Sequence, residues 1–143
     1  MKKLVRWETP FTDCEFPSVL VYTSFGESRK FLLNAVVSPN GLDRYPKYLI
    51  DFGEALAFAN FEEACAPKRD FSYVESDKNW SSASEYLNSP WLESYGPMFS
   101  RKENPLRHFL IFGGDSNLEV VTPKVPTFES IENSRVLSPR FVI

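Results

Sequence analysis

Hydrophobic and polar residues alternate along several short stretches of the chain, and this pattern predicts β-strands. Residues 18–25 and 30–38 are rich in β-branched and aromatic side chains, and residues 26–29 between them have the composition of a turn. We therefore expect a hairpin. From Phe31 to Val37 every position except Asn34 is apolar, which predicts a central strand that is covered on both faces.

Further strands are expected on either side of this hairpin. Residues 3–8 and 47–52 alternate, and residues 71–74 are apolar enough for another short strand. Residues 54–64 are ambiguous. Their Ala, Leu and Glu content favours a helix, whereas the alternation of larger apolar side chains with alanines favours a strand that closes a hairpin over Gly53. We prefer the strand, and the helix remains the alternative.

A short broken helix is predicted over residues 81–95. Glu85 follows Ser82 by three residues, which is the spacing of a capping box at a helix start. Pro90 disfavours the α conformation at the preceding residue, so the helix should stop or restart there. Trp91 and Tyr95 fit a second helical turn.

Residues 106–112 and 117–122 predict a second hairpin around a turn centred on Gly114-Asp115. This register pairs two sets of apolar residues on one face, which we expect to be buried: Phe109 with Val120, and Ile111 with Leu118. Residues 123–143 contain three prolines in a polar mixture, and we expect this segment to be an arm that lies over the surface.

Together these elements predict one domain over residues 1–143, of the α+β class, with mainly antiparallel sheet and one short broken helix. A chain of this length can bury roughly 68 to 70% of its unfolded surface, so a core is available without disulfides. The composition agrees with a β-rich domain that has stiff connections, because 13 Phe, 6 Tyr and 3 Trp accompany 11 Pro and only 6 Gly.

Charge and cysteine content narrow the expected partners and location. A net charge of -3 argues against nucleic-acid binding, which needs a basic surface. Arg6 and Glu8 interrupt any signal-peptide core. The sequence contains no stretch of about 20 apolar residues, so it predicts no membrane span. We therefore expect a cytoplasmic protein with Cys14 and Cys65 reduced. No metal or other cofactor is expected, since phosphate-binding loops, calcium loops and zinc spacings are absent.

His108 is the only histidine, so any catalytic hypothesis that needs an imidazole must include it. In the predicted register Glu119 is its diagonal neighbour on the same face, and such a carboxylate could orient the ring as in a general-base pair. No nucleophile motif accompanies the pair, so we assign no catalytic residue. His108 and Glu119 are instead candidate binding residues, together with Asp115 in the turn.

Trp91 directly follows a proline, which holds it in a rigid turn. Such a Trp either closes the edge of a core, which we prefer, or stacks on a ligand or partner. The segments 88–92, 108–111 and 118–121, with Asp115 between the last two, resemble a pattern in small uncharacterised bacterial proteins. The resemblance covers about a third of the chain. It implies an α+β domain and no activity.

The leading functional hypothesis is a non-enzymatic interaction protein whose acidic charge suits a basic protein partner, for example a toxin-neutralising immunity protein. The alternative is a small-molecule binding domain or weak enzyme that uses a pocket near His108 and Glu119. A purely structural subunit is the third possibility. The sequence leaves the partner, the ligand and the oligomeric state open.

Overall fold

The computed structural model describes residues 3–25, 31–62, 81–96, 103–138 and 141–143. Within them the chain is mostly antiparallel β-sheet with one short helix, so the expected antiparallel sheets are confirmed and the α+β class fits loosely. The elements in chain order are β1 (Lys3–Arg6), β2 (Ser18–Phe25), β3 (Phe31–Ser38), β4 (Lys47–Gly53), β5 (Ala57–Glu62), β6 (Ala83–Leu87), α1 (Pro90–Glu93), β7 (Arg107–Phe112), β8 (Ser116–Thr122), β9 (Thr127–Ile131), β10 (Val136–Ser138) and β11 (Phe141–Val142).

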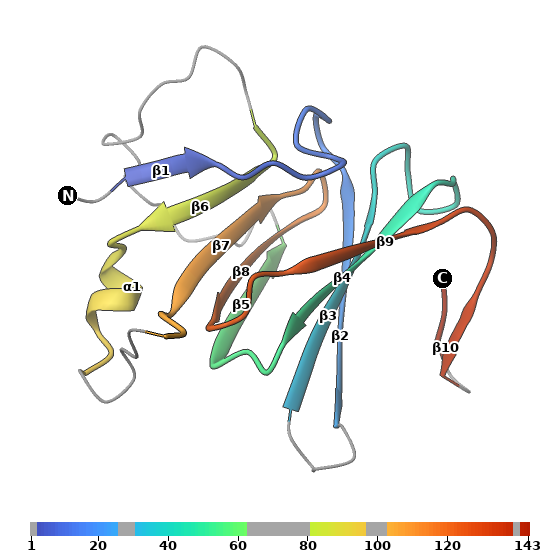
Figure 1. The fold of residues 1–143 in the computed structure, drawn as a ribbon. Coiled ribbons are helices and arrows are strands. Elements are labelled where there is room, and N and C mark those ends of the chain that lie inside the picture. The colour runs from blue at the N-terminus through green and yellow to red at the C-terminus, as the bar shows by residue number, and fades with distance from the viewer. Residues whose placement is uncertain (1–2, 26–30, 63–80, 97–102, 139–140) are drawn as a thin grey trace.

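Two sheets account for most of these strands. A five-stranded sheet has the order β1-β6-β7-β8-β5, and a four-stranded sheet has the order β2-β3-β4-β9 (Figure 1). β10 and β11 form a small sheet of their own near the C-terminus. The main core lies between the two large sheets, because apolar side chains from β3 and β4 pack against those from β7 and β8.

Both predicted hairpins are confirmed in their strands, and the second is also confirmed in its register. β2 pairs with β3 along eight consecutive residue pairs, and β7 pairs Phe109 with Val120 and Ile111 with Leu118 on β8. All four of these apolar side chains are at most 1% exposed. The turn predicted at residues 26–29 lies outside the described residues, as do the strand expected at 71–74 and Cys65.

The central position of β3 is also confirmed. Alternate residues such as Leu33 and Val37 face the main core, while Val36 on the other face packs with Ile131 and Ile143. Both faces of this strand are therefore covered. The almost entirely apolar sequence of residues 31–37 follows from that double burial.

The predicted helix at residues 81–87 is wrong, because residues 83–87 form β6. This strand pairs with β1 on one side and β7 on the other, so a helix here would leave β1 without a partner and would remove one of the two partners of β7. The residues of the supposed capping box bond elsewhere: Oγ of Ser82 donates to the carbonyl of Phe11, and Glu85 pairs with Arg107. The second helical turn is confirmed as α1. None of the described helices is long and apolar enough to cross a membrane.

Residues 57–62 form a strand, as preferred, but the hairpin over Gly53 is wrong. β4 belongs to the four-stranded sheet and β5 to the five-stranded sheet, so the chain crosses between sheets after Gly53.

The C-terminal segment also differs from the expected surface arm. Its residues 127–131 form β9, which extends the four-stranded sheet beside β4, and only the end of the chain lies against the outer face.

Candidate functional site

His108 lies in a buried polar network. Its Nε2 atom is 2.9 Å from Oε1 of Glu119, and its Nδ1 atom is 2.7 Å from Oγ of Ser89. The side chains of His108 and Glu119 are 1% and 6% exposed, and Ser89 is fully buried. Hydrogen bonds thus join a hydroxyl, an imidazole and a carboxylate away from solvent.

The local structure explains why these three groups meet. The register of β7 and β8 places His108 opposite Val121, so Glu119 is its diagonal neighbour on the same face, as predicted. Ser89 is the N-cap of α1, and its Oγ accepts a hydrogen bond from the backbone N–H of Leu92 at 3.1 Å. Pro90 then occupies a position where a missing N–H costs nothing.

Two aromatic rings enclose the imidazole. The ring of Tyr86 stacks nearly parallel on His108 at a centroid distance of 5.4 Å, and Trp91 meets it edge-on at 5.3 Å. Tyr86 is buried and Trp91 half-buried. Trp91 therefore packs against the histidine, which favours the structural role expected for it.

The order hydroxyl, imidazole and carboxylate is also that of a nucleophile, a general base and an orienting group. A nucleophile must reach its substrate, whereas Oγ of Ser89 is buried and already accepts the N–H of Leu92. With its proton on Nε2, His108 donates to Glu119 and accepts the Ser89 O–H at Nδ1, so each of these hydrogens has an acceptor. The network is thus chemically complete without a ligand.

The structure brings together three of the four candidate residues. Glu119 and Trp91 both contact His108, whereas Asp115 is exposed in the turn at the opposite end of the β7-β8 hairpin. Sequence reasoning misses Ser89. The signal that points to it is the Ser89-Pro90 pair, which is typical of an N-cap followed by the first helical residue.

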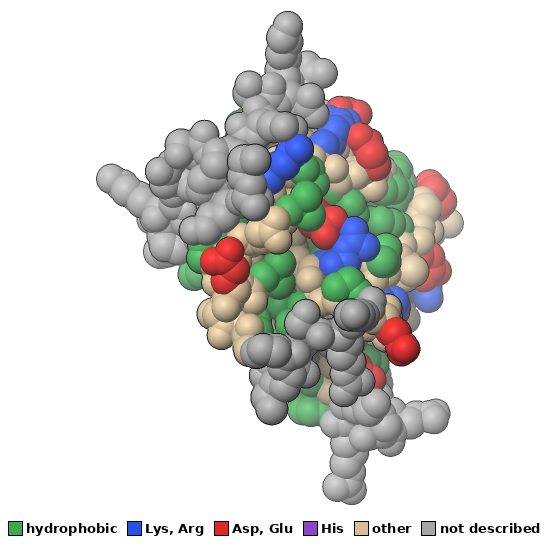
Figure 2. All heavy atoms as spheres, turned by 60° about the vertical axis from the view of Figure 1, so that its left-hand side comes forward, with side chains coloured by type: hydrophobic (Ala, Val, Ile, Leu, Met, Phe, Trp, Pro, Cys, Tyr) green, Lys and Arg blue, Asp and Glu red, His purple; other side chains and the backbone are tan. Residues whose placement is uncertain are grey.

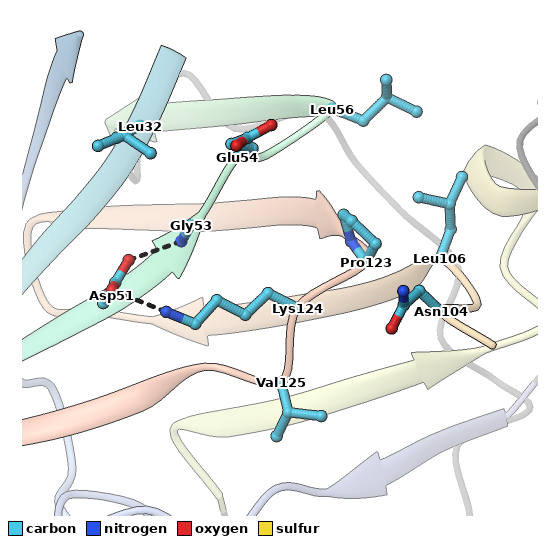
Figure 3. Close-up of a pocket in the computed structure, with 10 residues that line it drawn as sticks. All are labelled: Leu32, Asp51, Gly53, Glu54, Leu56, Asn104, Leu106, Pro123, Lys124 and Val125. Carbon is cyan, nitrogen blue, oxygen red and sulfur yellow. Dashed lines mark hydrogen bonds and ion pairs between the residues drawn. The ribbon is translucent and has the colours of Figure 1, made fainter. Parts of the chain in front are cut away.

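A groove of about 940 Å³ opens elsewhere, where the chain crosses between the two sheets. In Figure 3 its residues come from β3, from the end of β4 and from the segments that flank β5, β7 and β8. Two of its apolar residues are well exposed, Leu56 at 41% and Val125 at 61%. The apolar residues of the lining are Leu32, Leu56, Leu106, Pro123 and Val125.

Two crossovers meet at this groove and hold its shape. The first leaves β4 at Gly53, whose φ of 65° suits glycine, and ends where Leu56 donates its N–H to the carbonyl of Val121. The second leaves β8 after Thr122, whose hydroxyl donates to the carbonyl of Phe52 at 2.8 Å. The first crossover is therefore bonded to β8, and the end of β8, where the second crossover begins, is bonded to β4.

The groove also contains an ion pair. Nζ of Lys124 lies 2.7 Å from Oδ2 of Asp51, and Oδ1 of Asp51 accepts the N–H of Gly53 at 2.7 Å. In Figure 3 the Lys124 side chain extends across the groove toward Asp51. The two side chains are 37% and 47% exposed, so the pair is accessible to solvent. Glu54 and Asn104 complete the polar lining.

A smaller pocket of about 240 Å³ lies beside α1 and is lined by Leu92 and Tyr95, among others. Neither His108 nor Glu119 lines this pocket or the groove.

Cys14 is a free thiol whose Sγ donates to the carbonyl of Pro39, and burial together with Glu15 raises its pKa. Over the described part of the chain, no three potential metal-ligating side chains cluster.

No protein-family model, curated protein or solved structure matches this chain. The resemblance of residues 88–92, 108–111 and 118–121 to small bacterial proteins therefore stays a prediction.

Proposed function

We propose that this chain is a non-enzymatic cytoplasmic binding protein that neutralises a basic protein partner, as an immunity protein neutralises its toxin, and that the groove is its binding site. The observation that carries the proposal is the exposed apolar lining of the groove beside carboxylates. Exposed apolar surface in a concave site is typical of a binding surface.

The chemistry of the groove favours recognition over catalysis. Its polar side chains are two carboxylates, an amide and an amine, and the histidine network lies elsewhere. A partner that covers Leu56 and Val125 would gain most of its hydrophobic binding free energy there, because removing apolar surface from water contributes about 25 cal/mol per Å².

The charge of the groove favours a cationic occupant. Asp51 and Glu54 against Lys124 make the lining net acidic, in the same sense as the net charge of -3 of the whole chain. On the face drawn in Figure 2, hydrophobic, acidic and basic side chains are interspersed. The described residues visible there therefore form no continuous basic surface of the kind that phosphate backbones require.

The exposed ion pair gives a partner a place to bind. A solvent-accessible Lys-Asp pair contributes only about 0 to 1 kcal/mol, so a competing cation can displace Lys124 from Asp51 at small cost. An arginine is the best competitor, because its planar guanidinium bonds a carboxylate through two parallel N–H groups. We therefore expect an arginine flanked by apolar residues on the partner.

NMR titration of the ¹⁵N-labelled chain tests this binding chemistry. Acetyl-Leu-Arg-Leu-amide should shift the amide signals of Asp51, Gly53 and Leu56, whereas acetyl-Leu-Glu-Leu-amide should not. Asp51→Asn should weaken binding of the arginine peptide, and Asp115→Asn, at an exposed turn outside the groove, is the control. Equal response to both peptides would reject a cationic occupant.

A growth assay tests neutralisation itself. Cells that express a basic toxin encoded beside this chain should survive when the wild-type chain is co-expressed and die when it carries Leu56→Asp. Val136→Asp is the control, because Val136 is an exposed apolar residue outside the groove. Protection by Leu56→Asp equal to wild type would remove the groove from the mechanism.

A second candidate, a weak enzyme, is favoured only by the hydrogen-bond order of Ser89, His108 and Glu119. A fluorophosphonate probe, which labels activated serines, distinguishes the two candidates. Labelling of Ser89 that disappears in His108→Gln would support the enzyme. We expect no labelling, because Oγ of Ser89 is buried and caps α1.

A further inference from the structure

β2 forms one edge of the four-stranded sheet, and among the described strands it pairs only with β3. The pairing runs over all eight residues without a bulge, in contrast to the irregular pairing of β3 with β4. The outer side of β2 is therefore a regular edge that could accept another strand.

Two hydrogen bonds, made by the carbonyls of Pro17 and of Val19, show which backbone groups along β2 point away from β3. The N–H of Gly114 donates to the carbonyl of Pro17, and Oγ of Ser116 donates to the carbonyl of Val19. Backbone groups alternate in direction along an antiparallel strand, so the next outward residues are Val21, Thr23 and Phe25. The β7-β8 turn thus occupies the first half of this edge, and no described strand pairs with the second half.

The sequence of β2 lacks the features that usually protect such an edge. Proteins block edges with charged side chains, prolines, bulges or short strands. Residues 18–25 contain no charged residue and no proline. The other edge strands of the two large sheets all carry charges: Lys3 and Arg6 on β1, Glu62 on β5, and Glu129, which pairs with Arg135, on β9.

We propose that two copies of the chain pair through β2, antiparallel and about a two-fold axis near Thr23. Val21 of each copy would then face Phe25 of the other, and the outward N–H and C=O groups of all three residues would find partners. The two four-stranded sheets would become one continuous sheet of eight strands.

A second copy fits this edge better than the basic partner of the groove. An uncharged strand can lie against itself without repulsion, whereas it offers a cationic partner no carboxylate. Pairing would also cover exposed apolar surface, since Phe25, which would face Val21 of the other copy, is 76% exposed. This contact uses residues outside the groove, so the two proposals stand independently.

Sedimentation equilibrium from micromolar to millimolar protein tests the contact with two matched variants. Thr23→Lys places like charges near the axis and should raise the dimer dissociation constant at least about tenfold. Thr127→Lys makes the same change at an exposed threonine on β9, the opposite edge of the same sheet, and should leave the dimer unchanged.

A wild-type chain that stays monomeric throughout would overturn the proposal, and so would a dimer that survives Thr23→Lys or is lost in both variants. Hydrogen exchange on the wild type gives a second measurement should Thr23→Lys fail to fold. The amides of Val21, Thr23 and Phe25 should become at least about tenfold better protected as concentration rises through the dimer range. Unchanged protection of these amides would reject pairing through this edge.

Discussion

The Nε2 atom of His108 lies 2.9 Å from Oε1 of Glu119 on one face of the five-stranded sheet, where both side chains are almost completely buried. Glu119→Gln keeps the shape but replaces the carboxyl group with an amide that brings its own donors. We expect a loss of about 1 to 3 kcal/mol in the free energy of unfolding, as for other disrupted buried hydrogen bonds. Urea denaturation measures it.

Glu129→Gln is the control for this prediction, because Glu129 is exposed and should change stability by no more than about 0.5 kcal/mol. Equal stability of both variants would mean that the carboxylate contributes little to the buried network.

Ile111 is 1% exposed in the main core, opposite Leu118. Ile111→Ala should cost about 2 to 5 kcal/mol, because it removes buried methyl groups and leaves a cavity. The matched control is Val142→Ala, at a residue that is 61% exposed. Similar melting temperatures for the two variants would contradict the assigned core.

Trp91 is half-buried against the edge of the His108 ring. Trp91→Ala should lower stability by about 2 kcal/mol, less than the roughly 3 to 5 kcal/mol of a fully buried aromatic. Trp91→Phe keeps an aromatic ring and should recover most of this loss. A melting curve for Trp91→Ala that matches wild type would return Trp91 to the candidate binding residues.

The Cys14 thiol should react slowly at neutral pH. Burial disfavours the thiolate and the negative charge of Glu15 adds to this effect, so the pKa of Cys14 is raised. In a Cys65→Ser background, iodoacetamide alkylation should accelerate about tenfold per pH unit below that pKa.

Glu15→Gln removes a negative charge near the thiolate, so it should lower the pKa of Cys14 and speed alkylation at a fixed pH. Glu93→Gln on α1 is the control and should not change the rate. A rate in Glu15→Gln at or below that of the unmodified background would show that the carboxylate has no such effect.

Local sequence determined the two hairpins and part of the candidate site. Alternating apolar residues around a short turn specify a register, because a shift by one residue would move every apolar side chain to the wrong face. That register by itself places Glu119 diagonally from His108. The contact between these two residues is therefore predictable from neighbours in sequence.

The strand at residues 83–87 was decided by tertiary structure. Ser82 and Glu85 have helix-start spacing, but the weak local preference loses to two ladders of backbone hydrogen bonds, one with β1 and one with β7. The crossing at Gly53 has a similar cause. A turn after β4 looks the same in sequence whether the next strand joins its own sheet or the facing one.

The sequence by itself thus determined which stretches are strands over most of the described chain, which faces of the hairpins are apolar, and that His108 has a carboxylate neighbour. Only the tertiary structure decided how the sheets are assembled, that Ser89 completes the network, and that Asp51 meets Lys124 in a groove. The physical reason is the separation along the chain over which each effect acts. Periodicity and turn chemistry act between residues close in the chain, whereas the groove is built by two crossovers from segments far apart in it.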